Sequence, residues 1–166
     1  MVTACAVPVL PALVYPAPAN TRAEVPEVEL LTYPGVPSIF AGDEIGLEGS
    51  WGEDARRTIN WEDRSQWDHN FMSNVQQLIA IRKGNDALIN GGLRWIAAEK
   101  DFILYLRESK KQSVLIFVSR KGVNAKIDLS TLGLQVTKTL YGKDVSGSKF
   151  VIKSKEATQG IWVVTR

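Results

Sequence analysis

Two adjacent carboxylates, Asp43 and Glu44, follow a short run of small and apolar residues, Val36–Ala41. Paired carboxyl groups serve general acid–base and nucleophilic catalysis. In an extended chain, however, consecutive side chains point to opposite faces, so these two are poorly placed to act on one bond. The alternative is structural: the carboxylates cap the end of the run and pair with a nearby arginine such as Arg56 or Arg57.

A buried strand is the element that the sequence predicts to position these carboxylates. Pro34-Gly35 fits the central positions of a type II turn, because Pro presets its own φ and Gly tolerates the positive φ that follows. Val36–Ala41 is then bounded by turn residues on both sides, which favours a strand buried on both faces.

The stretch between Glu48 and Arg64 is rich in Gly, Asp and Glu and contains two tryptophans. Long loops of this kind carry function more often than packing. The broad apolar face and polar edge of a tryptophan suit stacking on a sugar ring. We expect Trp51, which lies between glycines, to be exposed, and Trp61 to be buried where the loop ends.

The residues from Tyr33 to Leu47 and from Arg56 to Trp61 form a compound pattern: Tyr-Pro-Gly-Val-Pro, a short apolar run, Gly-Asp-Glu-Ile-Gly, a polar loop, and Arg-Arg-Thr-Ile-Asn-Trp. This pattern resembles the eighth strand of the catalytic barrel, and the loop after it, in the α-amylase family of glycoside hydrolases (glycoside hydrolase family 13). The neopullulanase, cyclomaltodextrinase and maltogenic amylase branch is the most similar. The similarity continues more weakly through the next helix and into a β-rich tail, like that family's last barrel helix and its C-terminal sandwich domain.

The resemblance implies hydrolysis of α-glucosidic bonds in starch-derived oligosaccharides by an enzyme whose catalytic carboxylates lie elsewhere. Retaining hydrolysis needs two carboxyl groups about 5 Å apart. In the family these groups come from the fourth, fifth and seventh strands, which precede the stretch matched here. We therefore expect no catalytic residue in this chain and no activity from the chain alone. Asp43 and Glu44 are expected at the rim of the active site.

Substrate contacts are expected in the loop. In the neopullulanase-like branch an Arg at the place of Arg56, with an Asp four residues before it, contacts glucose units of the substrate. The earlier position is Gly52 here, although Asp54 stands close, so this sequence departs from the family pattern. Arg56 and Asp54 are thus expected to bind an α-glucan or maltooligosaccharide, with Trp51 stacking on it. The alternative for Arg56 is an ion pair that only fixes the loop.

Size and composition limit these expectations. At 166 residues the chain is shorter than a complete (β/α)8 barrel, which needs roughly 250. A net charge of +2, from 20 basic and 18 acidic residues, offers no electrostatic footprint for nucleic acid or an anionic membrane. One cysteine, Cys5, and one histidine, His69, form no zinc-binding cluster, and we expect no metal and no other cofactor. The low cysteine count is compatible with a reducing cytoplasm, where we place the protein.

Residues 1–29 differ from the rest in composition, since five of the seven prolines lie there among Ala and Val. No Lys or Arg precedes Arg22, and prolines interrupt the apolar stretch, unlike a signal peptide or a membrane span. We expect an irregular leader foreign to the fold, as a truncated gene or a shifted reading frame would produce. A degenerate export signal is the alternative.

A helix is predicted from Trp67 to Lys83, because apolar residues recur there at spacings of three and four. Asp68 or Asp63 is the expected N-cap, and Gly84-Asn85 is the expected end. The recurring positions are Phe71, Val75, Leu78, Ile79 and Arg82.

Seven short runs rich in β-branched or aromatic residues, separated by turn signals, predict an antiparallel sandwich after the helix. Trp95 and Trp162 fall in these runs and are expected in the core. The second and third runs are continuously apolar and should be central, whereas the fourth alternates and should have one wet face. The runs are Leu93–Ala97, Phe102–Arg107, Ser113–Ser119, Ala125–Leu129, Val136–Tyr141, Lys149–Ile152 and Ile161–Thr165.

The predicted fold is therefore an α+β fragment in three parts. Residues 1–29 form the leader, and residues 30–90 are the C-terminal remnant of a (β/α)8 catalytic barrel with its last strand and helix. Residues 91–166 form an antiparallel β-sandwich C-terminal domain.

Three interpretations stay open at this point. The chain is the C-terminal part of an α-glucan glycosidase, a non-catalytic accessory or carbohydrate-binding sandwich module, or a gene remnant without activity. The sequence decides neither the particular glucan and linkage, nor hydrolysis against glycosyl transfer, nor calcium binding, nor the oligomeric state.

Overall fold

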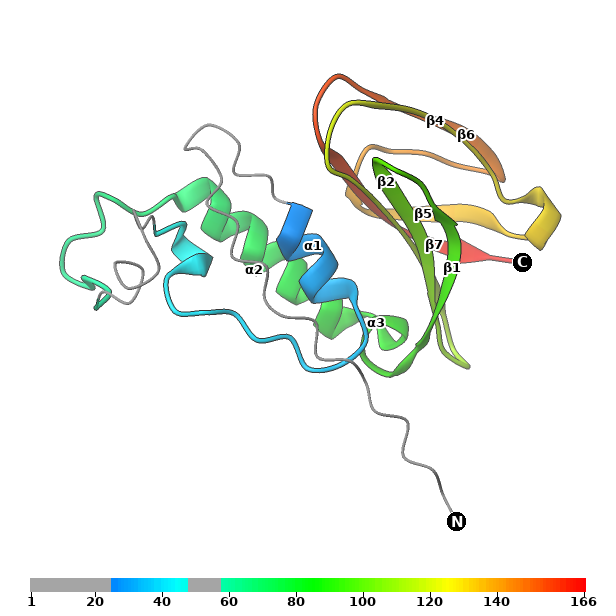
Figure 1. Cartoon of the computed structure of the whole chain (residues 1–166). Helices are drawn as coiled ribbons and strands as arrows, with labels where there is room; N and C mark the ends of the chain where they lie inside the picture. The colour runs from blue at the N-terminus through cyan, green and yellow to red at the C-terminus, as the bar shows by residue number, and fades with distance from the viewer. Residues whose placement is uncertain (1–24, 48–57) are drawn as a thin grey trace, which may run out of the picture.

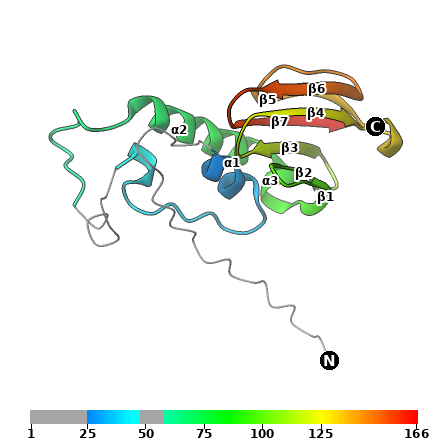
Figure 2. The ribbon, with the colours of Figure 1, turned by 45° about the horizontal axis from the view of Figure 1, so that its top comes forward.

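The computed structural model describes residues 25–47 and 58–166, which fold into three layers (Figures 1 and 2). A layer of helices lies on one face of a five-stranded sheet, and a two-stranded sheet lies on its other face. The helices are α1 (Val25–Thr32), α2 (His69–Gly84) and α3 (Asp86–Asn90), with short 3-10 turns η1 (Asp43–Ile45) and η3 (Ser130–Leu132).

All seven predicted strands are present, and their ends lie within a few residues of the predicted ones. They are β1 (Gly92–Ala98), β2 (Phe102–Glu108), β3 (Ser113–Ser119), β4 (Val123–Asp128), β5 (Gln135–Gly142), β6 (Lys149–Ser154) and β7 (Thr158–Thr165). The larger sheet has the order β1-β2-β3-β7-β5, and the smaller one pairs β4 with β6. Every pairing is antiparallel, so the sandwich fits the prediction.

Strand β2 shows how the larger sheet is buried on both faces. Leu104 and Leu106 belong to the core between the two sheets. Tyr105, between them, belongs to the core against the helices. Because side chains alternate along a strand, only a continuously apolar run can serve both cores. The prediction that β2 and β3 are central is confirmed, as is the alternation of β4.

The two tryptophans predicted to be core have opposite outcomes. Trp162 is buried, its indole NH donates to the Lys143 carbonyl at 3.0 Å, and its ring lies where a side chain on Gly160 would collide with it. Trp95 is 47% exposed, so that prediction is wrong. The reason is position: β1 is an edge strand, and the helix layer does not fully cover it.

Helix α2 confirms the prediction for the region 67–83, and its buried side chains are those of the predicted apolar face: Phe71, Val75, Leu78 and Arg82. The carboxylate of Asp68 accepts a hydrogen bond from the Phe71 amide at 2.9 Å, which settles the choice of N-cap. Asp63 instead accepts from the Ser65 amide within the preceding loop. The short helix α3 was not predicted, because Gly84-Asn85 indicated only an end.

The prediction that Val36–Ala41 forms a strand is wrong among the described residues. Residues 36–40 belong to no helix or strand and pair with no strand among the described residues, and Val36 is 96% exposed. Figures 1 and 2 show this segment running past α1 and α2, away from both sheets. A strand is defined by the neighbours that pair with it, and a local apolar run cannot supply them.

The boundary of the predicted leader also needs correction. Residues 25–29, assigned to an irregular leader, belong to α1, and Val28 and Leu31 on this helix are buried in the core against the sheet. Residues 1–24 and Cys5 with them lie outside the described residues.

Two buried arginines hold the C-terminal end of α1. Arg82 of α2 donates to the carbonyls of Leu31 and Tyr33 at 2.8 and 3.1 Å, and also to that of Gly35. Arg107 of β2 donates to the Thr32 carbonyl and, at 2.7 Å, to Gly91. The last carbonyls of a helix lack intrahelical partners and carry partial negative charge, so cations are favourable there. The two guanidinium groups thus join α1 to α2 and to the sheet.

The contribution of Arg107 can be measured against Arg94, an exposed arginine on the neighbouring strand. Arg107→Ala leaves two carbonyls without their donor and opens a cavity, so we expect a loss of about 3 kcal/mol in the free energy of unfolding. Arg94→Ala removes an exposed ion pair with Glu108 and should cost less than about 1 kcal/mol. Urea denaturation followed by circular dichroism compares the variants. Equal losses would contradict the role of Arg107.

The N-cap of α2 gives a second test. Asp68→Ala should lower the free energy of unfolding by about 1 kcal/mol, because the Phe71 amide loses its acceptor. Asp63→Ala is the control, with an expected loss below about 0.5 kcal/mol, since Asp63 is exposed and bonds only within its loop. The same urea titration decides, and a larger loss for Asp63→Ala would overturn the assignment.

Candidate functional site

Asp43 and Glu44, predicted at the rim of a site, form the short turn η1 between α1 and α2. A carboxylate oxygen of Glu44 accepts a hydrogen bond from the Gly42 amide at 2.8 Å, and Gly42 adopts a positive φ of 100°. Asp43 is exposed, whereas Glu44 is half-buried. Glu44 therefore closes a turn of its own backbone, which favours a structural role for it.

The space beside η1 is small. A cavity of about 30 Å3 lies between α1, Ile39, the turn η1 and Val75 of α2. A volume of this size holds at most one water molecule. The described residues around Asp43 and Glu44 therefore form no pocket that could accept a sugar unit by themselves.

The three predicted substrate contacts lie outside the described residues. Trp51, Asp54 and Arg56 all fall within residues 48–57, as does Arg57. Their roles stay predictions. The described structure begins again at Thr58, so it shows only the end of the loop that carries them.

The end of this loop carries an exposed aromatic group, which we call the loop aromatic group: Trp61, Arg64 and Trp67. The two indole rings meet edge to face with centroids 5.4 Å apart, and the Arg64 guanidinium lies 5.0 Å from the centroid of Trp67. Trp61 is 61% exposed, so the prediction that it is buried is wrong among the described residues. Its apolar face is free to stack on a planar or ring-shaped ligand.

Trp67 and Arg64 were not identified from the sequence. Trp67 was assigned to the start of a helix, yet it precedes the N-cap Asp68 and belongs to a turn in which its amide donates to the Arg64 carbonyl at 3.1 Å. One feature of the sequence could have indicated this group: Trp61, Arg64 and Trp67 stand three residues apart, ahead of the N-cap Asp68. His69 is exposed at the first position of α2.

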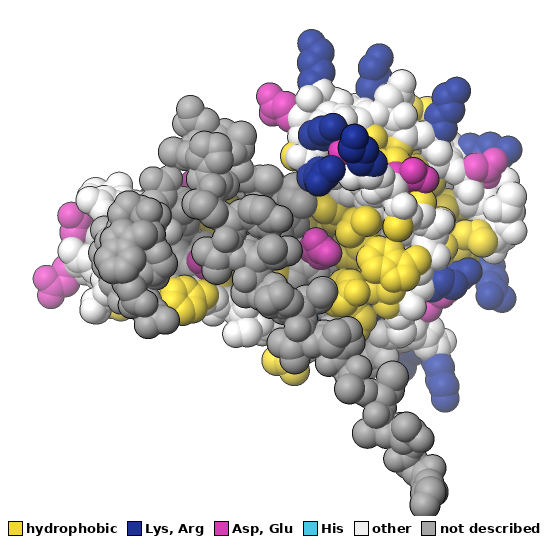
Figure 3. Space-filling view, viewed as in Figure 1, with side chains coloured by type: hydrophobic (Ala, Val, Ile, Leu, Met, Phe, Trp, Pro, Cys, Tyr) yellow, Lys and Arg dark blue, Asp and Glu magenta, His cyan; other side chains and the backbone are white. Residues whose placement is uncertain are grey.

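A second aromatic group lies on the sandwich side. The ring centroids of Trp95 and Tyr105 are 5.4 Å apart, and Tyr33 lies 6.4 and 6.3 Å from them. Tyr105 is buried, shares a 2.6 Å hydrogen bond with the Thr32 hydroxyl, and has its pKa raised by burial. Figure 3 shows hydrophobic side chains gathered beside the helices. Trp95 of β1 is 47% exposed.

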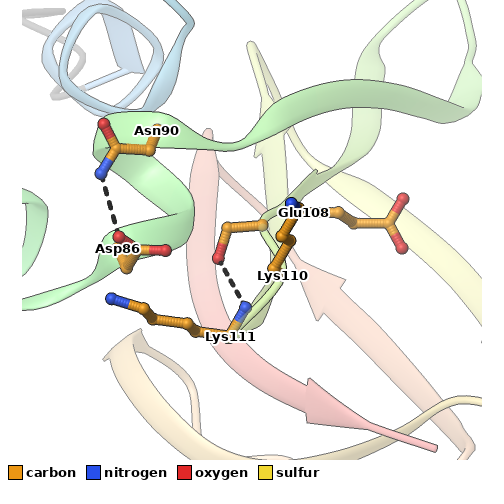
Figure 4. Close-up of a pocket in the computed structure, with 6 residues that line it drawn as sticks. Asp86, Asn90, Glu108, Lys110 and Lys111 are labelled. Atoms are coloured by element: carbon orange, nitrogen blue, oxygen red, sulfur yellow. Dashed lines mark hydrogen bonds between the residues drawn. The ribbon is translucent and has the colours of Figure 1, made fainter.

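A shallow depression lies at the other end of the sheet, between α3 and the turn that joins β2 to β3 (Figure 4). Its two carboxylates are already engaged. Asp86 accepts from the Asn90 amide at 2.9 Å, and Glu108 binds both Nε and Nη2 of Arg94. Hydrogen bonds from Ser109 and Asn90 lower the pKa of Asp86. The depression therefore offers no free pair of carboxylates for acid–base chemistry.

Residues 25–47 and 58–166 contain no group of three or more His, Cys, Asp or Glu placed to hold a metal ion. None of their helices has the length and apolar character that crossing a bilayer requires.

Comparison with known proteins gives relatives named as cyclomaltodextrinase, neopullulanase and maltogenic amylase. No family model matches the chain. The chain is 33% identical over 101 residues to a cyclomaltodextrinase from Geobacillus thermopakistaniensis (strain MAS1), covering 60% of this chain and 17% of the relative. It is 30% identical over 133 residues to neopullulanase 2 from Thermoactinomyces vulgaris, covering 74% of this chain and 22% of the relative. The chain thus spans about a fifth of the length of these relatives.

A solved structure agrees with these relatives. The debranching enzyme from Nostoc punctiforme matches 84% of this chain and 30% of its own, with a TM-score of 0.69 and 26% sequence identity. The chain therefore resembles the C-terminal portion of α-amylase family glycoside hydrolases of the neopullulanase, cyclomaltodextrinase and maltogenic amylase kind.

Glu29 of α1 gives a prediction about how the stability of the chain depends on pH. Burial raises the pKa of Glu29 above its usual value of 4.5. The stability that the neutral carboxyl contributes is then fully present below pH 4.5 and is lost as the pH rises through the folded-state pKa. Glu29→Gln cannot ionise, so it should raise the urea midpoint at pH 7 and leave it nearly unchanged at pH 4.

The exposed Glu99 gives the matched control, since Glu99→Gln should shift the midpoint little at either pH. A Glu29→Gln variant that is no more stable than the unmodified chain at pH 7 would show that burial of this carboxylate carries no cost.

Proposed function

We propose that this chain is the C-terminal portion of an α-glucan glycosidase, an enzyme that hydrolyses α-glucosidic bonds in starch-derived oligosaccharides. One observation carries the proposal. The order of parts in this chain, a loop-bearing segment, helix α2 and then a β-sandwich, is matched over 84% of its residues by a debranching enzyme structure. Its sequence relatives carry names for enzymes of cyclomaltodextrin, pullulan and maltose-forming chemistry.

We further propose a division of the chain into two parts. Residues 30–90 are the C-terminal remnant of a (β/α)8 barrel, and residues 91–166 are the sandwich domain. The seven strands and their shared core support the second part. Helix α2, with one buried face and a free outer face, supports the first. Because α1 packs on the same sheet, we extend the first part back to Val25.

The chain is proposed to be catalytically incomplete alone. In support, it spans about a fifth of its sequence relatives. Glu44 accepts a hydrogen bond from the Gly42 amide within its own turn, which favours a structural role over membership of the catalytic pair about 5 Å apart that retaining hydrolysis needs. The cytoplasmic location expected from the cysteine count stays a prediction.

Substrate binding is proposed for the loop that contains Trp51, Asp54 and Arg56. The loop aromatic group stands directly after these residues and offers an exposed indole face at Trp61. An α-glucan or maltooligosaccharide in the intact enzyme would then contact cationic, anionic and aromatic side chains from one stretch of chain, residues 51–67.

The alternative is a non-catalytic carbohydrate-binding sandwich module. The observation in its favour is Trp95, which is half-exposed on the edge strand β1 and braced by Tyr33 and Tyr105. A tryptophan held in this way on a sandwich domain has an accessible apolar face for a sugar ring.

Two measurements on the purified chain test the glycosidase proposal and the alternative of a carbohydrate-binding module. We expect no hydrolysis of maltooligosaccharides or cyclodextrin under conditions where a cyclomaltodextrinase is active. We expect weak binding of maltoheptaose, measured by tryptophan fluorescence, and a loss of about threefold to tenfold in affinity in Trp61→Ala because one stacking contact is lost. Trp95→Ala is the matched control and should bind like the unmodified chain.

Each other outcome has a definite meaning. Clear hydrolysis would show that the catalytic carboxylates lie in this chain after all. A larger loss of affinity in Trp95→Ala than in Trp61→Ala would replace the proposed site with the sandwich module. No binding at all by the unmodified chain would refute both glucan-contacting surfaces.

A further inference from the structure

Charge is divided unequally between the two parts of the chain. Residues 91–166 contain 14 Lys and Arg against six Asp and Glu, whereas residues 1–90 contain six Lys and Arg against 12 Asp and Glu. The formal charges are therefore +8 for the sandwich part and −6 for the rest, a separation that the net charge of +2 conceals. In the view of Figure 3, the Lys and Arg side chains lie over the sandwich side of the molecule. Such an asymmetry indicates an interaction with a charged partner.

The outer face of the two-stranded sheet carries part of this positive charge. Side chains alternate along β4 and β6, and one set, which includes Ala125, Ile127 and Ile152, enters the core between the sheets. Every side chain of the opposite set is exposed. We call this set the basic face: Asn124, Lys126 and Asp128 of β4, with Lys149, Val151 and Lys153 of β6. It presents three ammonium groups and one carboxylate to solvent.

Two of the three lysines of the basic face have no compensating charge. Lys149 forms an exposed ion pair with Asp128 at 3.0 Å. No ion pair between described residues involves Lys126 or Lys153. Lys126 stands opposite Val151, two residues from Lys153, so the two lysines are diagonal neighbours across the strand pair. Like charges at neighbouring cross-strand positions repel each other, and an anionic partner would relieve this repulsion.

The charge is also polarised across the layers of the fold. The β4–β6 sheet covers one face of the five-stranded sheet, and the helices lie on its other face. The described residues up to Asn90, which form the helix layer and its connections, carry eight acidic and three basic side chains. A negatively charged plane therefore attracts the basic face and repels the opposite side, which favours one orientation of the molecule.

We propose that the basic face binds the surface of an anionic lipid bilayer as a peripheral contact. Lysine is a compact point charge, which suits a plane of anionic headgroups. Nucleic-acid recognition relies more on arginine forks and on aromatic side chains that stack on bases, and the basic face contains neither. Val151, 44% exposed in the middle of the face, offers an apolar group to the headgroup boundary. This inference is independent of the proposed function.

Co-sedimentation of the purified chain with lipid vesicles tests the proposal. Phosphatidylcholine vesicles that contain about 30% phosphatidylserine should bind the chain, because each lysine near an anionic surface contributes about fivefold in affinity. Vesicles of phosphatidylcholine alone should not bind it. Raising the salt concentration from about 0.1 M to about 1 M shortens the Debye length from about 10 Å to about 3 Å, so binding should weaken at least tenfold. Equal binding to both kinds of vesicle, or to neither, overturns the proposal.

Two double variants locate the contact. Lys126→Gln with Lys153→Gln removes two charges from the basic face and should lower the affinity for the anionic vesicles at least tenfold. Lys110→Gln with Lys111→Gln is the matched control, because it removes the same charge from the exposed turn between β2 and β3. It should change the affinity less than about twofold.

Both double variants should keep the circular dichroism spectrum and urea midpoint of the unmodified chain, because all four lysines are exposed. Equal losses of affinity in the two variants would show that total charge drives binding, and would refute the assigned face.

Competition with a short DNA duplex separates a lipid surface from nucleic acid as the partner. At a phosphate concentration equal to that of the anionic lipid, the duplex should displace less than about half of the bound chain. Displacement of most of the chain, together with weaker binding to the duplex in the Lys126→Gln, Lys153→Gln variant, would assign the basic face to nucleic acid and refute the lipid proposal.

Discussion

The burial of the five-stranded sheet on both faces is the constraint on which the rest of the structure depends. Along β2, Leu104 and Leu106 enter the core between the sheets, and Tyr105 and Arg107 turn to the helices. Apolar area removed from water contributes about 25 cal/mol per Å2, so losing either cover would expose one full face of β2 and β3 at large cost. The sandwich therefore needs its helix layer, because β2 contributes side chains to the core on each side of the sheet.

The end of helix α1 places backbone carbonyls in this core, and these carbonyls need hydrogen-bond donors. The last turn of α1 ends against the sheet, where its carbonyls are shielded from water and need donors. Arg82 and Arg107 supply them from two different elements, and burial lowers the pKa of both guanidinium groups, with the neighbouring charge of Arg82 lowering that of Arg107 further. Through the bond from Arg82 to the Gly35 carbonyl, the same network sets the path of the chain toward Asp43 and Glu44. A structural interaction in the core thus positions the turn that carries Asp43 and Glu44.

In the sequence Asp43 and Glu44 suggest acid–base chemistry, but in the structure Glu44 has a structural role. Glu44 closes a turn, while the exposed groups suited to a ligand are aromatic: Trp61 with Trp67 after the loop, and Trp95 on β1. This division fits a chain that resembles the C-terminal portion of larger enzymes. Here the described residues contribute support and contact surface.

The sequence by itself determined the seven strands, helix α2 and the identity of β2 and β3 as central strands, because those features follow from local periodicity and from turn residues. It also pointed to Asp68 as one of two possible caps. Tertiary structure alone decided that α1 extends into the supposed leader, since its helix is held by arginines 50 or more residues away. It likewise decided that Trp61 and Trp95 are exposed, and that Val36–Ala41 stays unpaired among the described residues. The physical reason is common to all three: burial and strand pairing depend on which distant surfaces arrive, and a residue pattern does not specify its neighbours.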